Sequence, residues 1–227
     1  FPNKVNLERA VCDFRGQTRG FQFLNIAYEA SLFFHATAST GGAPPNNFEF
    51  NTLNIRDGGV LQFPIGATVY AYHISIGNEG SESSRLIVNE EIKFFVDFDF
   101  IIHERGWVDG TSSTNGADIL ISSCLGTVVN DDSICIRVDG TIDVTTTGGG
   151  GGKIELNSTI VRGTGTLTTD RVEIRARNTT VELTFDHPGC VTDVQTTFLA
   201  PEKKAYECSC DDMKAKEDSL NICQDTV

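Results

Sequence analysis

Over most of the chain, apolar residues alternate with polar ones in short runs, which is the pattern of half-buried β-strands. Each run places two to five apolar side chains on one face, and Gly, Asn, Asp, Ser and Thr separate the runs. The sets that we expect to point inward are Leu61, Phe63 and Ile65; Tyr70, Tyr72, Ile74 and Ile76; Ile92, Phe94, Val96, Phe98 and Phe100; Ile119 and Ile121; Ile134, Ile136 and Val138; Ile142 and Val144; Ile154 and Leu156; Val172 and Ile174; and Val181, Leu183 and Phe185. The pattern predicts an all-β protein.

Helical periodicity is confined to the two ends of the chain. Near the N-terminus, four apolar residues follow the spacing i, i+3, i+4 and i+7, which predicts a short amphipathic helix, with a strand at residues 5–7 as the alternative. These four residues are Leu7, Ala10, Val11 and Phe14. Near the C-terminus, Asp211 and Asp212 open a run without Gly or Pro, and acidic residues favour the first turn of a helix.

The connections between the strands favour a solenoid. On spacing alone, an antiparallel sandwich, a barrel and a solenoid are equally compatible with the runs. Asp139-Gly140 has the composition of a tight hairpin turn, yet the strands on its two sides are unequal, and a run of threonines then leads into the glycines 148–152. Short strands, tight corners and long polar excursions are typical of stacked coils. We keep an antiparallel β-sandwich as the alternative fold.

Several segments resemble coils of the right-handed parallel β-helix, the fold of the pectin-lyase-like superfamily. They are residues 52–63, residues 98–110, and the glycine run that leads into 153–156 and 163–167. The resemblance covers about residues 50–186. It implies a right-handed parallel β-helix of about six to eight coils, closed at its start by the N-terminal helix. The organisation that we expect is a cap and lead-in at 1–49, a β-solenoid at 50–200 and a Cys-rich tail at 201–227.

Charge and length restrict the possible partners. The chain has 227 residues, enough for a sizeable core, and its net charge is −13. A strongly acidic protein is repelled by nucleic acid. No apolar run approaches the roughly 20 residues of a membrane-spanning helix. We therefore expect neither nucleic-acid binding nor membrane insertion.

Cysteine usage indicates an oxidising compartment. The seven cysteines lack the paired spacing of a zinc site, so disulfides are expected. The candidates are Cys12, Cys124, Cys135, Cys190, Cys208, Cys210 and Cys223. Glycosylation sequons begin at Asn157 and at Asn178, in agreement with that compartment. The sequence predicts a secreted or cell-surface glycoprotein in which Cys124 and Cys135 are close enough to be bridged.

One aspartate-rich region suggests catalysis. Residues 115–123 and 130–136 are similar to the paired aspartate segments of polygalacturonase-type glycoside hydrolases, and this implies Asp118, Asp131 and Asp132 as catalytic candidates. Inverting hydrolysis needs an acid and a base about 6.5 to 9.5 Å apart. Too few residues separate Asp118 from Asp131 for one full coil, and that family's Gly-His-Gly and Arg-x-Lys segments are missing. We favour a corner in which Asp131 and Asp132 cap backbone amides.

A second acidic pair raises the question of a metal. Asp97 and Asp99 point to the same side of one predicted strand and would begin a calcium site, although two outward carboxylates more often form a solvated surface. The histidines lack metal-ligand spacing, so calcium is the one cofactor that we consider. The balance of fifteen Phe against one Trp and four Tyr is that of a core rather than of a sugar-binding platform.

We expect an extracellular structural or adhesive module of a surface coat, filament or matrix. Stacked coils form a stiff rod, and the unpaired strand edges at solenoid ends are docking surfaces for other protein subunits, including copies of the same chain. The alternative is a polysaccharide-degrading glycoside hydrolase or lyase that uses the clustered aspartates, with a polysaccharide as its partner.

Overall fold

The structure is a computed structural model that describes residues 4–14, 20–35, 46–78, 80, 82–111, 116–124, 134–145, 152–169, 171–187, 190–198 and 202–207. All regular structure in these residues is β. The strands are β1 (Val5–Glu8), β2 (Val11–Phe14), β3 (Gly20–Ala27), β4 (Ser31–Phe34), β5 (Asn47–Ile55), β6 (Val60–Gln62), β7 (Ala67–Ile76), β8 (Ser84–Ile87), β9 (Glu91–Ile102), β10 (Gly106–Asp109), β11 (Asp118–Ser123), β12 (Ile136–Val138), β13 (Thr141–Asp143), β14 (Lys153–Gly163), β15 (Thr166–Thr168), β16 (Arg171–His187), β17 (Cys190–Phe198) and β18 (Glu202–Glu207).

Strand β9 shows how one coil forms three ladders. Its first half, residues 91–96, pairs in parallel with β7 of the preceding coil and with β11 of the next. Its second half, residues 99–102, pairs with the second half of β7 and with β12. After a tight corner, β10 pairs with β8 and with β13. Each full coil therefore has three sides, which we call face A, face B and face C in chain order.

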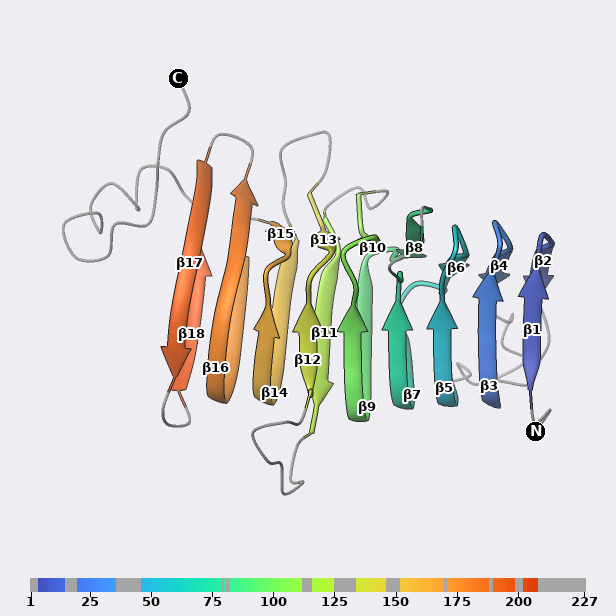
Figure 1. The fold of residues 1–227 in the computed structure, drawn as a ribbon, viewed down its shortest axis with the longest axis horizontal. Coiled ribbons are helices and arrows are strands. Elements are labelled where there is room, and N and C mark those ends of the chain that lie inside the picture. The colour runs from blue at the N-terminus through green and yellow to red at the C-terminus, as the bar shows by residue number, and fades with distance from the viewer. Residues whose placement is uncertain are drawn as a thin grey trace, which may run out of the picture.

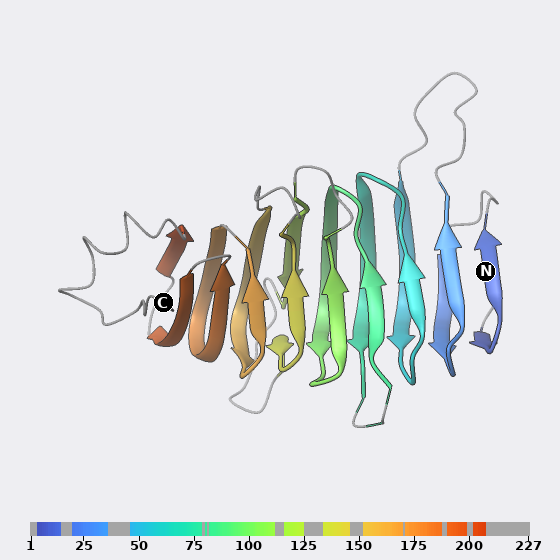
Figure 2. The same cartoon turned by 90° about the horizontal axis from the view of Figure 1, so that it is seen from above.

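The coils stack along the long axis of the molecule. In Figure 1 the strands of face B stand side by side in chain order, from β1 near the N-terminus to β16, and Figure 2 shows two layers of strands crossing the same axis. All ladders from β1 to β16 are parallel. The predicted parallel solenoid is confirmed at this level, and the antiparallel sandwich is not formed.

The last coil is closed by a reversal of the chain. Strand β16 passes through all three faces and pairs in parallel with β14 and β15. Strand β17 then runs back along residues 179–187 of β16, and β18 runs back along residues 171–176, both antiparallel. The strand edge at the C-terminal end of the parallel stack is thus paired, which removes one site of edge-to-edge association.

The predicted N-terminal capping helix is wrong. Residues of that segment form β1 and β2, which pair in parallel with β3 and β4. Arg9 has a φ of 51° and turns the chain between them, so the helical spacing arises from two short strands on either side of a corner. The side chain of Val11, part of the predicted stripe, is 77% exposed. The parallel ladders therefore begin at Val5, inside the range 1–49.

Phenylalanine side chains fill the interior of the first coils. Because neighbouring coils pair in register, each inward ring lies over the inward ring of the next coil: Phe34 stacks on Phe63 at 5.5 Å between centroids. Phe63 also makes edge or tilted contacts with Phe48, Phe50 and Phe94. Aromatic pairs of this kind add about 0.5 to 1.5 kcal/mol to the stabilisation from apolar burial.

Four residues predicted to point inward are exposed. They are Ile65, Tyr70, Tyr72 and Phe98, at 54%, 44%, 45% and 42% exposure. Ile65 lies in a turn before β7. In the first half of β7 the inward side chains are those of Ala67, Val69 and Ala71. A register shift between Ala71 and His73 lets the strand bend from face A to face B, and the inward side chains of the second half are those of Ile74 and Ile76. The bend changes the phase of the alternation, so a single period of two cannot describe the whole strand.

Replacing Phe63 by alanine is expected to lower the free energy of unfolding by about 3 to 5 kcal/mol, because the substitution removes a buried ring that contacts four others. Urea denaturation followed by circular dichroism measures the change. Ile65→Ala, at the exposed turn, is the control and should stay within about 0.5 kcal/mol of the wild type. Equal losses in both variants would contradict the inward stack.

Candidate functional site

Two pairs of aromatic rings stack on the outside of the solenoid, where face A bends into face B. Tyr70 of β7 and Phe95 of β9 are register partners, and their ring centroids are 5.5 Å apart with an interplanar angle of 20°. Tyr72 and Phe98 repeat this arrangement at 5.6 Å and 13°. Both separations are close to the spacing of neighbouring strands, about 4.8 Å. The rings therefore stack along the solenoid axis.

A histidine and an aspartate continue this surface onto face B. Nδ1 of His73 lies 3.2 Å from Oδ2 of Asp99, its register partner in the next coil. The imidazole of His73 also makes edge contacts with the rings of Tyr72 and Phe98. The other carboxylate oxygen of Asp99 is buried and has no hydrogen-bond partner among the described residues. Burial raises the pKa of the Asp99 carboxyl, and the neighbouring His73 acts in the opposite direction.

A shallow groove of 470 Å³ lies beside the aromatic pairs and crosses four coils. Its apolar part comes from Phe21, Phe50, Tyr70, Ala71, Tyr72 and Phe95. Its polar part consists of the carboxylates of Glu49 and Asp97 and the amides of Gln22 and Asn51. The described lining of the groove contains no Lys or Arg. An aromatic surface with acidic groups and no cation favours a ligand that carries positive charge.

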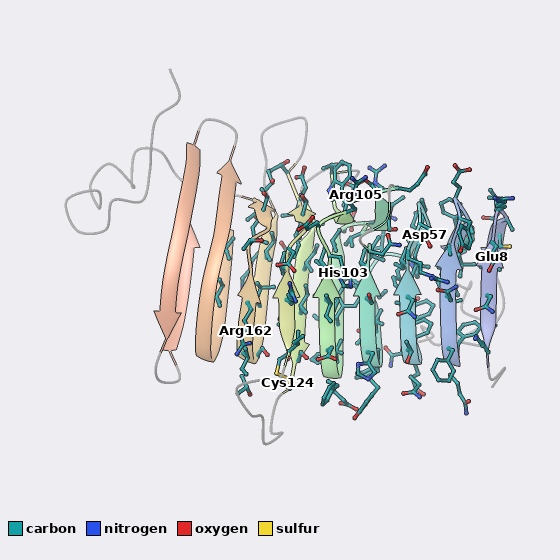
Figure 3. All side chains as sticks on the ribbon, in the orientation of Figure 1. Glu8, Asp57, His103, Arg105, Cys124 and Arg162 are labelled. Carbon is teal, nitrogen blue, oxygen red and sulfur yellow. A yellow bond between two sulfur atoms is a disulfide. The ribbon has the colours of Figure 1, made fainter. Side chains whose placement is uncertain are left out.

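A second groove, of 440 Å³, lies on face B nearer the N-terminus. Three asparagines, Asn6, Asn25 and Asn54, occupy one row of successive coils there. Arg56 donates from Nε to Oδ1 of Asn25 at 3.2 Å, and His103 lies within hydrogen-bond distance of the Ser75 hydroxyl. Figure 3 marks His103 part of the way along the solenoid. The groove is polar, and several of its groups already bond to one another.

Of the three predicted catalytic aspartates, the structure describes one, Asp118. Asp118 begins β11 on face A, and its exposed side chain accepts a hydrogen bond from the backbone N–H of Lys153 at 3.0 Å. Asp131 and Asp132 lie outside the described residues. The register partner of Asp118 in the preceding coil is Glu91, whose carboxylate already pairs with Nζ of Lys93 at 2.7 Å.

The predicted calcium pair is split by the bend in β9. Asp97 lines the groove on face A, whereas Asp99 bonds to His73 on face B. Within the described ranges, no group of three or more His, Cys, Asp or Glu residues is arranged to hold a metal ion. The neighbour of Asp99 is therefore an imidazole rather than a second calcium ligand.

Cysteines 124 and 135 form a disulfide with a Cα–Cα separation of 5.6 Å, as the sequence predicts. It closes the excursion between β11 and β12, and Figure 3 shows Cys124 at the edge of the solenoid opposite that of Arg105. Cys12 on β2 is unpaired within the part of the chain that the structure describes. Cys190 begins β17, and Cys208, Cys210, Cys223 and the predicted C-terminal helix lie outside the described residues.

The two sequons fall on parallel strands. Asn157 lies on face A of β14, where it is half-buried beside its register partner Ser122. Thr159 of the same sequon donates its hydroxyl to the backbone carbonyl of Cys124 at 3.0 Å. Asn178 lies in β16, opposite Ile160. Glycosylation at both positions remains a prediction.

No protein-family model, no curated protein and no solved structure matches this chain. Among the residues with a described position, none belongs to a helix long and apolar enough to cross a membrane.

Sequence reasoning missed the outward aromatic pairs. Their members are 25 and 26 residues apart (70 to 95 and 72 to 98), and alternation within one strand says nothing about the partner in the next coil. The bend itself leaves no signal in the sequence, because apolar and polar residues alternate without interruption from Val96 to Phe100.

Asp99→Asn is expected to change how stability depends on pH. A raised pKa means that the folded protein binds this proton more tightly than the unfolded chain, so the ionised carboxyl costs stability above its folded pKa. That cost disappears as the pH falls through the folded pKa. The variant, which cannot titrate here, should therefore gain most over the wild type at neutral pH and lose this advantage in acid. Urea denaturation across the pH range tests this, and parallel curves for the two proteins would be the contrary result.

Replacing both Cys124 and Cys135 by serine is expected to lower the free energy of unfolding by about 2 to 3 kcal/mol, because the open chain regains the entropy of a short loop. Denaturation under non-reducing conditions measures the loss, and Cys12→Ser serves as a thiol control. Peptide mass mapping of the unreduced wild type should recover the linked pair. Unlinked peptides would contradict the assignment.

Proposed function

We propose that this protein is a non-enzymatic, extracellular structural or adhesive module of a surface coat, filament or matrix. The observation that carries this proposal is the row of exposed, stacked aromatic side chains on a continuous parallel solenoid. Contiguous exposed apolar patches are uncommon on soluble monomers and mark surfaces that bind a partner. A stack of hydrogen-bonded coils is stiff, so it holds such a surface at a fixed distance from its ends.

The handedness of the coil, its superfamily, its secretion and its glycosylation belong to the same proposal. We take the coil to be right-handed, because parallel crossover connections are right-handed in almost all known cases. The three-faced parallel coil supports a relation to the pectin-lyase-like superfamily. The Cys124–Cys135 disulfide and the sequons at Asn157 and Asn178 support secretion and glycosylation.

The N-terminal end of the solenoid supports self-assembly. Strands β1 and β2 each pair with one neighbour, β3 and β4, and no described strand pairs with their other edge. Ser31 donates its backbone N–H to the carbonyl of Ala10 at 2.8 Å. In a parallel ladder the bonds alternate, so the N–H and C=O of Val11 point away from β4 toward the free edge. Such an edge can accept a strand from another molecule.

Concentration-dependent assembly tests the proposal. The weight-average mass from light scattering should rise with protein concentration, and electron microscopy should show particles joined at their ends. Val11→Pro removes the N–H at the free edge and keeps the bonds to β4, so it should reduce assembly. Val11→Thr, which keeps that N–H, is the matched control.

Two results would overturn this part of the proposal. One is a strict monomer at every concentration; the other is equal assembly of Val11→Pro and Val11→Thr. Release of reducing sugar from a polysaccharide, abolished by Asp118→Asn, would favour the enzymatic alternative instead.

A further inference from the structure

We propose that the groove beside Tyr70 and Tyr72 binds an extended, arginine-bearing peptide segment of a partner protein. The inference rests on the proposed adhesive function and gives the chemistry of the partner. It is carried by the stacking geometry of the rings, by the charges along the groove and by the groove's length.

The stacking geometry covers one face of the Tyr70 ring with Phe95 and directs the other face toward Glu49. Glu49, Tyr70 and Phe95 occupy one row in three successive coils. One face of the Tyr70 ring is covered by Phe95, and the opposite face is turned toward the coil that carries Glu49. A planar guanidinium placed there would be the next member of the stack. It would lie flat on the tyrosine ring and pair with the carboxylate, a combination that suits arginine better than lysine.

The charges along the groove favour a cationic ligand. Glu49 and Asp97 both line it, and neither forms an ion pair with any residue that the structure describes. The whole chain carries a net charge of −13, which attracts basic segments over a distance and speeds their association. Charge-assisted hydrogen bonds from arginine to carboxylate are about twice as strong as neutral ones.

The same geometry argues against a neutral sugar. Sugar rings bind to broad aromatic faces, but here each ring has one face covered by its stacking partner, and the other face of Tyr70 is turned toward the carboxylate of Glu49. Four coils line the groove, from Phe21 to Phe95, and strands spaced by about 4.8 Å span about 14 Å. That length accommodates about four residues of an extended chain. The side-chain amides of Gln22 and Asn51 are placed to bond to its backbone.

Isothermal titration calorimetry on the full chain tests the inference with two matched probes. The first is the blocked peptide Gly-Arg-Gly-Arg-Gly, and the second carries citrulline, which has nearly the same shape without the charge, in place of arginine. The arginine peptide should bind, and the citrulline peptide should bind about tenfold more weakly or not at all. Binding of the arginine peptide should also weaken as the salt concentration rises.

Variants of the chain localise the binding. Tyr70→Ala and Glu49→Gln should each weaken the arginine peptide by about fivefold to tenfold, whereas Tyr70→Phe, which keeps the ring, should bind like the wild type. The controls are Tyr28→Ala and Glu104→Gln, which remove an exposed tyrosine and an exposed carboxyl outside the groove. Their binding should be unchanged. Thermal unfolding shows whether each variant is folded.

Three outcomes would overturn the inference: equal binding of the arginine and citrulline peptides, equal weakening by Tyr28→Ala and Tyr70→Ala, or displacement of the arginine peptide by an uncharged cello-oligosaccharide. The last outcome would assign the groove to a glycan. Any of them can occur while end-to-end assembly persists, so failure here is distinguishable from failure of the proposed function.

Discussion

Main-chain hydrogen bonds between successive coils set the position of every described side chain on this solenoid. Because these ladders are parallel and in register, a residue of one coil lies about 4.8 Å from its counterpart in the next. Inside, this produces rows such as Ile26, Ile55, Ile76 and Ile102 on face B, which are fully buried. Outside, it produces the stacked pairs of Tyr70 with Phe95 and Tyr72 with Phe98. Core and binding surface thus depend on the same ladders.

The bend between face A and face B brings polar and aromatic side chains together at one corner. A strand that turns there exposes two successive side chains, as at Asp97 and Phe98, and so creates a denser surface than a flat strand does. A side-chain hydrogen bond also links this corner to the next coil: the hydroxyl of Ser123 donates to the backbone carbonyl of Phe98 at 2.7 Å. The disulfide from Cys124 closes the excursion that leaves from the same corner. The disulfide therefore cross-links the coil that follows the last coil of the aromatic groove.

The sequence predicts the class of fold because strand length and corner composition are local properties. It also places Phe94 and Phe100 inside, because both fall on the apolar positions of one alternating run. It misplaces Leu7 and Val11 on a helix because two short strands around a corner imitate the helical spacing. It misses Tyr70 and Phe95 as a pair because register between coils is a long-range property that depends on the lengths of the intervening loops. No single-sequence pattern encodes that register.

The most direct test of the parallel stack is a cysteine cross-link on face C. Thr141 of β13 and Thr166 of β15 are register partners, whereas Thr168 lies opposite Asp143. Register partners in neighbouring strands are about 4.8 Å apart at Cα, within reach of a disulfide. The account predicts that Thr141→Cys with Thr166→Cys forms an intramolecular disulfide under mild oxidation, identified by peptide mass mapping, and that Thr141→Cys with Thr168→Cys does not. A cross-link in the second pair, or in neither, would contradict the stacked coil.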